Sequence, residues 1–401
     1  MLWNDVQPAP PDAILGLTEA FRNDPEPRKV NLGVGVYKDE AGNTPVLESV
    51  KEAERRLLET ETSKSYLPIP GDPLYGEHVR ELLFGPRSEI AASGRAVTAH
   101  TPGGTGALRL GATLLHTFHP GAAVWLSRPT WANHRGIFAA AGFELREYPY
   151  YDPETRGVDF DALHAALSEI PAGDIVVLHV CCHNPTGADL DDRQWRQIAA
   201  LAAEKGWVPF LDFAYQGFAE SLEADRRPLE HFAAAGIDFL VAGSFSKNFG
   251  LYCERTGALT LIAPDRRQAE TAFSHLKRAV RVTWSNPPAH GGRIVTTILG
   301  DDALRRRWEE ELAAMRDRIR NMRILLAEKL AARRPDRDFS FITRQRGMFS
   351  FSGLSDAVVD WLRANRSIYI VKGGRINVAG LTPRNIDYVC DAVADALDAV
   401  E

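Results

Sequence analysis

Cysteine is scarce in this sequence of 401 residues, and long apolar runs are absent. The four cysteines are Cys181, Cys182, Cys253 and Cys390; two of them are neighbours, so the pattern provides no disulfide framework and fits a reducing compartment. No stretch approaches the roughly 18 apolar residues of a membrane-spanning helix. The first residues, MLWNDVQPAPPD, have neither the basic nor the apolar part of a secretion signal. We therefore expect a cytoplasmic protein without a membrane anchor.

An excess of basic residues is also missing. The sequence has 47 Lys and Arg against 53 Asp and Glu, a net charge of −6. Proteins that bind nucleic acid through its phosphates need clustered Lys and Arg, so nucleic acid is not an expected partner. With 45% hydrophobic and 25% charged residues, the composition is that of a globular protein and excludes a disordered or collagen-like chain. The length exceeds what one hydrophobic core of about 250–300 residues supports, which predicts two lobes.

The middle of the chain alternates short apolar runs with helical patterns. The predicted strands are residues 122–127, 143–148, 175–182, 207–213, 239–244 and 256–262. The gaps between most of them hold a crossover helix, such as residues 190–206, which ends on a glycine. This alternation predicts an α/β domain with a mainly parallel sheet and helices on both faces. Ligands of such sheets bind at the carboxyl ends of the strands, so we look for chemistry there.

A second pattern begins near residue 300 with one long helical stretch. Its apolar residues are spaced alternately four and three apart, from Trp308 to Leu326. A coiled coil with a partner is one interpretation, but fewer than three heptads favour a spine that links two lobes. Strand-like runs at residues 349–354, 367–371 and 375–380 follow it. We expect an N-terminal arm (1–12), a smaller α+β domain (13–45 and 315–401) and a large domain (46–314).

Several polar residues follow the predicted strands directly. TPGGTG (101–106) precedes a helical run, which indicates a phosphate cradle, although a plain helix-capping turn is equally compatible. Asp212 is the one charge in WVPFLDFAY and needs a cationic partner, such as a protonated heteroaromatic nitrogen; the alternative is a structural carboxylate. Lys247 in GSFSKNFG ends another strand, where desolvation would lower the pKa of its amine and make it a nucleophile and base. Ser244, Ser246 and Arg255 beside it suit a phosphate ester.

The segment HVCCHNPTG (179–187) admits two interpretations. His179, Cys181 and His183 would share one face of a strand and imitate a metal tripod, but no fourth ligand has suitable spacing, so we expect no metal. The turn at Asn184-Pro185 exposes an amide that can donate to a ligand oxygen, and Tyr215 could donate to the same oxygen.

Three further side chains suit ligand recognition. Trp131 has a flat face that can stack on a ring, or it can simply cover the core. Arg281 and Arg375 lie in turn-rich surroundings, and a guanidinium is suited to a bidentate contact with a carboxylate. One interpretation is that both arginines are ordinary surface charges. The other is that each binds a carboxylate, which predicts a substrate with two carboxylates.

As a set, these residues resemble the class I aminotransferases that use pyridoxal phosphate, specifically the aspartate and aromatic amino-acid group. The resemblance runs over nearly the whole chain, through NLGVGVYKDEAG, SYLPIPG, TPGGTGALRLGA, PTWANH, CCHNPTGADL, FLDFAYQGF, SFSKNFGLYCERTGAL, SNPPAHG, GMFSFSGL and GGRINVAG. It implies a fold type I homodimer whose two active sites are shared across the interface.

The resemblance also implies a role for each residue of the site. Lys247 would form the internal aldimine and move the substrate proton. Asp212 would hold the pyridinium N–H, Asn184 and Tyr215 the phenolic oxygen, and Trp131 would stack on the ring. The residues that would bind the phosphate are Gly104, Thr105, Ser244, Ser246, Arg255 and, from the neighbouring subunit, Tyr66. The substrate would be bound by Arg375 at its α-carboxylate, by the backbone of Gly35 and, from the neighbouring subunit, by Arg281.

The resemblance leaves the substrate open within the group. We expect transfer of the amino group between aspartate and 2-oxoglutarate, giving oxaloacetate and glutamate, because a desolvated guanidinium at Arg281 favours a second carboxylate. GGR stands where many relatives carry SGR, and Trp284 stands where relatives often carry a different aromatic residue. Aromatic-preferring relatives retain both arginines and let the distal one swing aside, so Arg281 does not exclude phenylalanine or tyrosine, and an aromatic amino-acid aminotransferase is the alternative. More remote alternatives are a PLP lyase or decarboxylase and a non-catalytic α/β module that binds a phosphorylated ligand.

Overall fold

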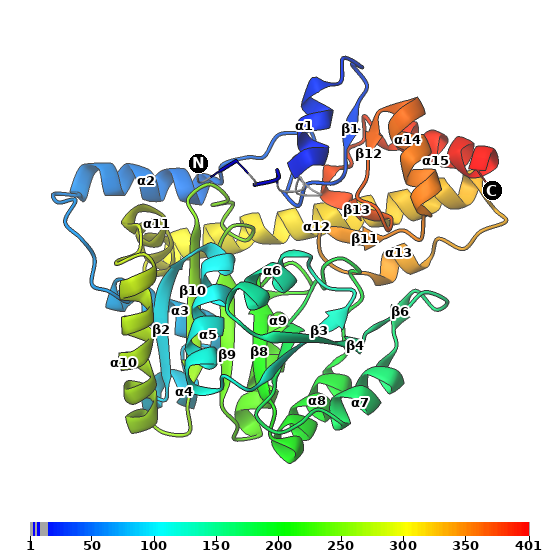
Figure 1. Ribbon diagram of the computed structural model, residues 1–401. Coiled ribbons are helices and arrows are strands. Elements are labelled where there is room, and N and C mark those ends of the chain that lie inside the picture. Colours follow the sequence, from blue (N-terminus) through cyan, green and yellow to red (C-terminus); the bar gives the residue numbers. More distant parts are fainter. Residues whose placement is uncertain (1–2, 5, 9–14, 401) are drawn as a thin grey trace.

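A computed structural model describes residues 3–4, 6–8 and 15–400 of the chain. Its centre is a seven-stranded sheet with the order β2-β10-β9-β8-β7-β3-β4, in which β10 runs antiparallel to both neighbours and the other pairs are parallel (Figure 1). This confirms the expected α/β class. The strands are β2 (Ala96–Pro102), β3 (Ala123–Arg128), β4 (Glu144–Pro149), β7 (Ile175–His179), β8 (Val208–Phe213), β9 (Phe239–Ser244) and β10 (Thr256–Ile262).

Successive residues of a strand point to opposite faces of the sheet. Apolar side chains lie on both faces, and helices cover each of them. Phe210 and Leu240 belong to one apolar cluster, which α5, α6 and α10 also supply. Leu211 and Val241 belong to the other cluster, with side chains of α3, α8 and α9. The helices are α3 (Pro73–Phe84), α5 (Gly103–Phe118), α6 (Asn133–Ala140), α8 (Asp192–Lys205), α9 (Leu222–Ala234) and α10 (Arg266–Thr283).

The crossover helix α8 shows why these elements start and stop where they do. The side chain of Asp191 accepts from the backbone N–H of Gln194, and the side chain of Gln194 accepts in return from the N–H of Asp191. At the other end Gly206 has φ +74°, a left-handed conformation that glycine adopts without steric cost.

Helix α12 (Asp302–Arg333) is the predicted spine and runs past the sheet toward the C-terminal elements (Figure 1). It contacts α2 (Glu48–Thr60) and α11 (Ala289–Leu299) near one end and α13 (Phe341–Arg344) and α15 (Ile386–Val400) near the other. The apolar stripe that the sequence indicates is buried: Trp308, Leu312, Met315, Ile319, Met322 and Leu326.

The smaller group of elements joins the two ends of the chain. Strand β1 (Val30–Asn31) pairs in parallel with β12 (Ile368–Tyr369), and β11 (Phe349–Phe351) pairs antiparallel with β13 (Arg375–Asn377). The described segment from residue 15 to residue 45 therefore packs on the C-terminal elements. The remaining elements are α1 (Leu15–Asn23), α4 (Glu89–Ser93), β5 (Tyr151–Asp152), β6 (Gly157–Val158), α7 (Phe160–Ser168), α14 (Asp356–Arg366) and the 3₁₀ helix η1 (Val378–Gly380).

The predicted domain boundaries remain predictions. Helix α12 passes through residue 315 without a break, and most of the predicted arm, residues 1–12, lies outside the described residues. Within the described part, no helix combines the length and apolar character that a membrane crossing requires. All four cysteines are free thiols.

Three details differ from the sequence expectation. Strand β2 was not among the predicted strands. The run at residues 175–182 leaves the sheet after His179, because Cys182 takes a left-handed conformation with φ +52°. The prediction that His179, Cys181 and His183 share one face of a strand is therefore wrong. The final run, 375–380, forms only three strand residues before it turns into η1.

Candidate active site

A cavity of about 440 Å³ lies at the carboxyl ends of β7, β8 and β9, beside the N-terminus of α5. Twelve of the fourteen predicted site residues line it: Gly35, Gly104, Thr105, Trp131, Asn184, Asp212, Tyr215, Ser244, Ser246, Lys247, Arg255 and Arg375. These residues come from both ends of the chain as well as from the sheet. The cavity therefore joins the large sheet to the smaller group of elements.

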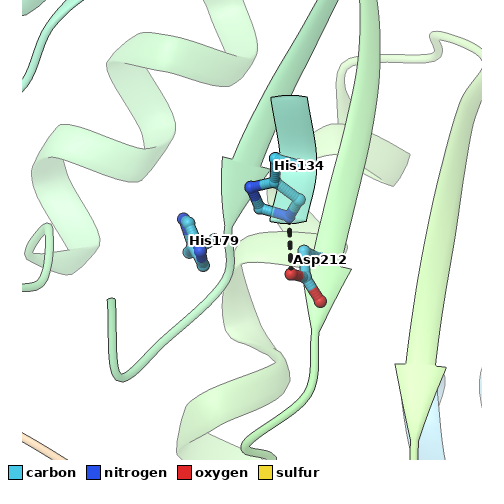
Figure 2. Close-up of side chains that lie close together, drawn as sticks. All are labelled: His134, His179 and Asp212. Atoms are coloured by element: carbon cyan, nitrogen blue, oxygen red, sulfur yellow. Dashed lines mark hydrogen bonds and ion pairs between the residues drawn. The ribbon is translucent and has the colours of Figure 1, made fainter. Parts of the chain in front are cut away.

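Asp212 is the buried carboxylate at the end of β8. Its Oδ2 accepts a hydrogen bond of 3.0 Å from Nε2 of His134, while the other oxygen points away from both neighbouring histidines (Figure 2). Burial acts to raise the pKa of Asp212, but the hydrogen bond and charge of His134 and the charge of Lys247 outweigh it, so the pKa lies below its ordinary value. An ionised carboxylate with one free oxygen is suited to hold a cationic N–H.

His134 is a functional candidate that the sequence interpretation missed. It is fully buried in α6, and its Nδ1 forms a 2.8 Å hydrogen bond with the hydroxyl of Thr130. Both ring nitrogens are thus engaged, which fixes the ring against Asp212. The block PTWANH contains this histidine, but no local pattern indicates that it reaches a carboxylate 78 residues further along the chain.

His134, His179 and Asp212 offer three ligand atoms within 4.8 Å of one another, an arrangement that could hold a metal ion (Figure 2). His179 is buried, and burial lowers its pKa to about 3, so its ring is neutral. His179, Cys181 and His183 do not form a metal tripod. Cys181 Sγ faces the carbonyl oxygen of Tyr215 at 3.6 Å, and both ring nitrogens of His183 are bonded, to Ser127 and Thr186.

Lys247 stands in the turn after β9 with its amine 4.7 Å from the ring centre of Tyr215. Burial lowers the pKa of Lys247 to about 8; Arg255 acts in the same direction and Asp212 opposes it. This is the partly desolvated amine that the sequence predicts. At neutral pH a much larger fraction of it is unprotonated, and therefore nucleophilic, than for an ordinary lysine.

The opposite wall of the cavity is a cradle for an anion. Gly104 and Thr105 lie in the first turn of α5, where free backbone N–H groups and the helix dipole favour negative charge. Arg255 donates from Nη1 to the hydroxyl of Ser246 at 3.2 Å. A side chain at Gly103, which has φ +71°, would collide with Arg255, since its Cβ would lie 2.4 Å from Nη2. Glycine at position 103 therefore leaves room for the Arg255 guanidinium.

Arg375 is buried at the end of the cavity nearest the smaller group of elements. It donates to Oδ1 of Asn184 at 3.3 Å and to the carbonyl oxygen of Gly33, and it lies over the ring of Phe349 at 4.4 Å. No hydrogen bond in the described structure uses its buried Nε. A guanidinium held by neutral oxygens, with a donor to spare, is prepared for a carboxylate.

Aromatic side chains close the cavity. Trp131 is half-buried and meets His134 edge to face, with ring centres 5.3 Å apart. Burial raises the pKa of Tyr215, which keeps its hydroxyl protonated and able to donate. Phe349 and Tyr252 also line the cavity but were not predicted; the hydroxyl of Tyr252 accepts from the backbone N–H of Tyr37 at 2.9 Å.

Two predicted residues, Tyr66 and Arg281, do not reach this cavity. Tyr66 is 92% exposed, and Arg281 is exposed near the end of α10, where it donates to the hydroxyl of Ser285 at 2.5 Å. Ser285 in turn bonds Asn286, and the side-chain amide of Asn286 donates to the carbonyl oxygen of Leu67 at 2.8 Å. The segments that carry Tyr66 and Arg281 are therefore tied together on one surface.

Comparison with known proteins agrees with this geometry. The family model for aminotransferase class I and II matches residues 27–393. The chain is 54% identical to the aspartate aminotransferase of Salmonella typhi over 396 residues, 99% of this chain and 100% of that protein. It is 46% identical to the aromatic-amino-acid aminotransferase of Pseudomonas aeruginosa, over 97% of each chain.

The same fold is found among solved structures. The aromatic-amino-acid aminotransferase of Burkholderia pseudomallei, covalently bound to pyridoxal phosphate, superimposes with a TM-score of 0.97 at 52% identity, over 99% of this chain and 100% of that chain. This likeness confirms the expected fold type I architecture. With a matching family model and full-length relatives, the chain belongs to the class I and II aminotransferases.

Proposed function

We propose that this protein is a pyridoxal-phosphate-dependent aminotransferase that moves the amino group between aspartate and 2-oxoglutarate. The observation that carries the proposal is one cavity with Lys247, the ionised Asp212, an anion cradle and Arg375 around its walls. The sequence similarity to the aspartate aminotransferase of Salmonella typhi supports the same reaction.

The residues present fit pyridoxal phosphate. The cradle of Gly104, Thr105, Ser246 and Arg255 suits a phosphate, and Gly103 leaves room for the Arg255 guanidinium that belongs to it. The free oxygen of Asp212 suits a protonated ring nitrogen. We assign the phosphate contacts also to Ser244, and the contacts to the phenolic oxygen to Asn184 and Tyr215.

When bound, the cofactor supplies an electron sink for the bonds that break at the substrate Cα. Lys247 would hold the cofactor, and its amine, with a pKa lowered to about 8, would accept and return the proton of the substrate Cα near neutral pH. Asp212 keeps the ring nitrogen protonated by remaining ionised. Trp131 covers the ring and limits the access of water.

Substrate recognition divides between two arginines. Arg375 binds the α-carboxylate, and Gly35 leaves space beside it, since a Cβ there would lie 2.7 Å from the ring of Phe349. Arg281 of a second subunit receives the side-chain carboxylate. An aromatic amino-acid aminotransferase is the second candidate, because a protein with that name shares 52% identity and the fold with this chain.

We further propose that the protein is a homodimer with shared active sites. Tyr66 and Arg281 lie on tied segments, and large apolar side chains are exposed nearby in sequence, with Leu58 85% and Val282 82% accessible. Burial of such side chains in a subunit interface would be favourable. A cytoplasmic location is supported by the four free thiols.

The test is the ratio kcat/KM for aspartate, phenylalanine and tyrosine with 2-oxoglutarate, in the unaltered protein and in Arg281→Ala. We expect the preference for aspartate to collapse by about a hundredfold or more in the variant, because a buried carboxylate loses its guanidinium, while aromatic turnover survives. Arg267→Ala, an exposed arginine on the same helix, is the matched control. Equal losses for all three substrates in Arg281→Ala would overturn the role given to Arg281.

A further inference from the structure

A second large cleft, of about 580 Å³, is lined by residues of α12, of α13 and the segment after it, and of the loop between β8 and α9. It is distinct from the active site and shares none of its lining residues. Five arginines line it: Arg316, Arg320, Arg323, Arg344 and Arg346. Only two lining residues are acidic, Glu220 and Asp317, so the lining carries a net charge of three positive units.

The carboxylates neutralise only part of this charge. Arg346 forms an ion pair of 2.6 Å with Glu220, and Arg316 lies 3.6 Å from its sequence neighbour Asp317. Within the described part of the chain, Arg320, Arg323 and Arg344 form no ion pair. Arg344 donates only to neutral oxygens, at 3.3 Å each, on Ser340 and Thr155.

Arg323 is unusual because it is almost fully buried, with 3% of its surface accessible. Its guanidinium donates to four backbone carbonyl oxygens, those of Ile342, Arg346, Gly347 and Phe349. Burial without an ion pair lowers the pKa of Arg323 to about 10. A buried cation is normally compensated by a negative charge close by. The charge of Asp189, which lines a different cleft, opposes the lowering of the Arg323 pKa, but no carboxylate of this cleft pairs with Arg323.

Three of the five arginines lie on α12 and repel one another. Arg316, Arg320 and Arg323 are spaced four and three apart in α12, so they lie on one face, where like charges repel. Arg344 and Arg346 approach the same cleft from the segment between α13 and β11. Guanidinium groups on a concave surface are the donors that proteins use for phosphate and carboxylate groups. Arg320 and Arg344 are the exposed arginines of this cleft that form no ion pair.

We propose that this arginine cleft is a binding site for a compact oxyanion with several negative charges. The concave shape and the volume suit a small molecule. The net charge of the lining, three positive units, matches an anion with three negative charges. Two such anions are compared: pyrophosphate, which offers phosphoryl oxygens, and citrate, which offers carboxylate oxygens. The inference does not depend on the proposed function, because no active-site residue contributes to it.

The test is calorimetric titration of the cofactor-loaded protein with pyrophosphate and, separately, citrate at constant ionic strength. We expect one ion to bind per chain outside the active site, and the one with the lower Kd identifies the chemical form. In the double variant Arg320→Gln/Arg344→Gln the Kd should rise about tenfold or more, because each charge-assisted hydrogen bond contributes to binding. Both residues are exposed, and neither contacts the active site.

Two controls make the outcome decisive. Arg306→Gln removes an exposed arginine of the same helix that does not line the cleft, and it should leave the Kd within about twofold, because a single distant charge is screened by salt. Arg375→Lys reports binding in the active site instead. The proposal is overturned if neither anion binds, if the double variant binds as tightly as the unaltered protein, or if only Arg375→Lys weakens binding.

Discussion

At the scale of single residues, the site depends on two charges that shift each other's protonation. Asp212 is buried and still ionised because His134 donates to it, and Lys247 is a cation whose pKa burial lowers. The chemistry proposed here needs both states: a carboxylate that keeps a ring nitrogen protonated, and an amine that can lose its proton near neutral pH.

The lowered pKa of Lys247 predicts how the cofactor attaches. Only the unprotonated amine is nucleophilic, so the rate of covalent attachment of pyridoxal phosphate to the cofactor-free protein should rise with pH, with a midpoint near 8 and a plateau above it. Absorbance after rapid mixing, followed across the pH range, measures this rate. A midpoint near 10.5, the ordinary value for lysine, would show that the amine is fully solvated.

Removing the carboxylate should weaken the cofactor's hold and its reactivity. In Asp212→Ala we expect faster loss of pyridoxal phosphate on dialysis and half-reactions slowed by about a hundredfold or more, since a buried charge partner is lost. Stopped-flow rates with aspartate measure the second effect. Asp192→Ala, a carboxylate at the start of α8 outside the cavity, serves as the control; unchanged rates in Asp212→Ala would contradict the assignment.

At the scale of elements, the phosphate cradle exists because strands and a helix approach unusually closely. Gly257 in β10 faces the start of α5: a Cβ on it would lie 2.4 Å from the carbonyl carbon of Gly103 and 2.8 Å from the carbonyl oxygen of Gly243. These are backbone atoms, which cannot rotate away. The absence of a side chain at one strand position therefore sets the position of the helix N-terminus.

Gly257→Ala should consequently disturb both stability and cofactor binding. We expect destabilisation of about 1–3 kcal/mol from overpacking, seen as a lower midpoint of thermal unfolding, together with weaker retention of pyridoxal phosphate. Gly121→Ala is the matched control, because no atom lies within 4 Å of its Cβ position. If the two variants unfold at the same temperature, β10 and α5 are not packed as closely as described.

At the scale of the whole molecule, one chain supplies only part of the proposed site. Twelve predicted residues line a single cavity, whereas Tyr66 and Arg281 lie on the surface. In a symmetric dimer the same surface of each subunit faces the other, so each chain can complete its neighbour's site. The proposed preference for aspartate is then a property of the pair.

This arrangement can be tested by mixing two variants that are each expected to have little or no activity with aspartate. Lys247→Ala lacks the amine, and Arg281→Ala lacks the distal guanidinium. After unfolding and refolding together, a hybrid dimer contains one intact site, so activity with aspartate should return to about a quarter of the unaltered value, since about half the dimers are hybrids. Each variant refolded alone is the control. No recovery, with hybrids verified by mass, would exclude sites shared in this way.

Much of the site was predictable because its signals are local. Lys247 and Asp212 are charges that end apolar strands, and Gly104 and Thr105 precede a helical run, so each pattern is visible within about ten residues of sequence. The family resemblance then supplied the roles. The spine of α12 was predictable for the same reason, from the regular spacing of its apolar residues.

Other features were not predictable because they depend on contacts between distant segments. His134 acquires its role from a carboxylate 78 residues away, and Tyr252 meets the backbone of Tyr37 across 215 residues. The left-handed conformation of Cys182 ends β7 earlier than its apolar run suggests. Local hydrophobic patterns contain no information about such partners.

The sequence by itself determined the α/β class, most of the strands and helices and most of the residues proposed to bear the chemistry, since periodicity and strand-end charges are properties of short segments. Only the tertiary structure decided which of these charges are buried together, which stay on the surface, and that five arginines converge on a second cleft. The physical reason is that desolvation and electrostatic coupling depend on distances through space, and the folded chain alone sets those distances.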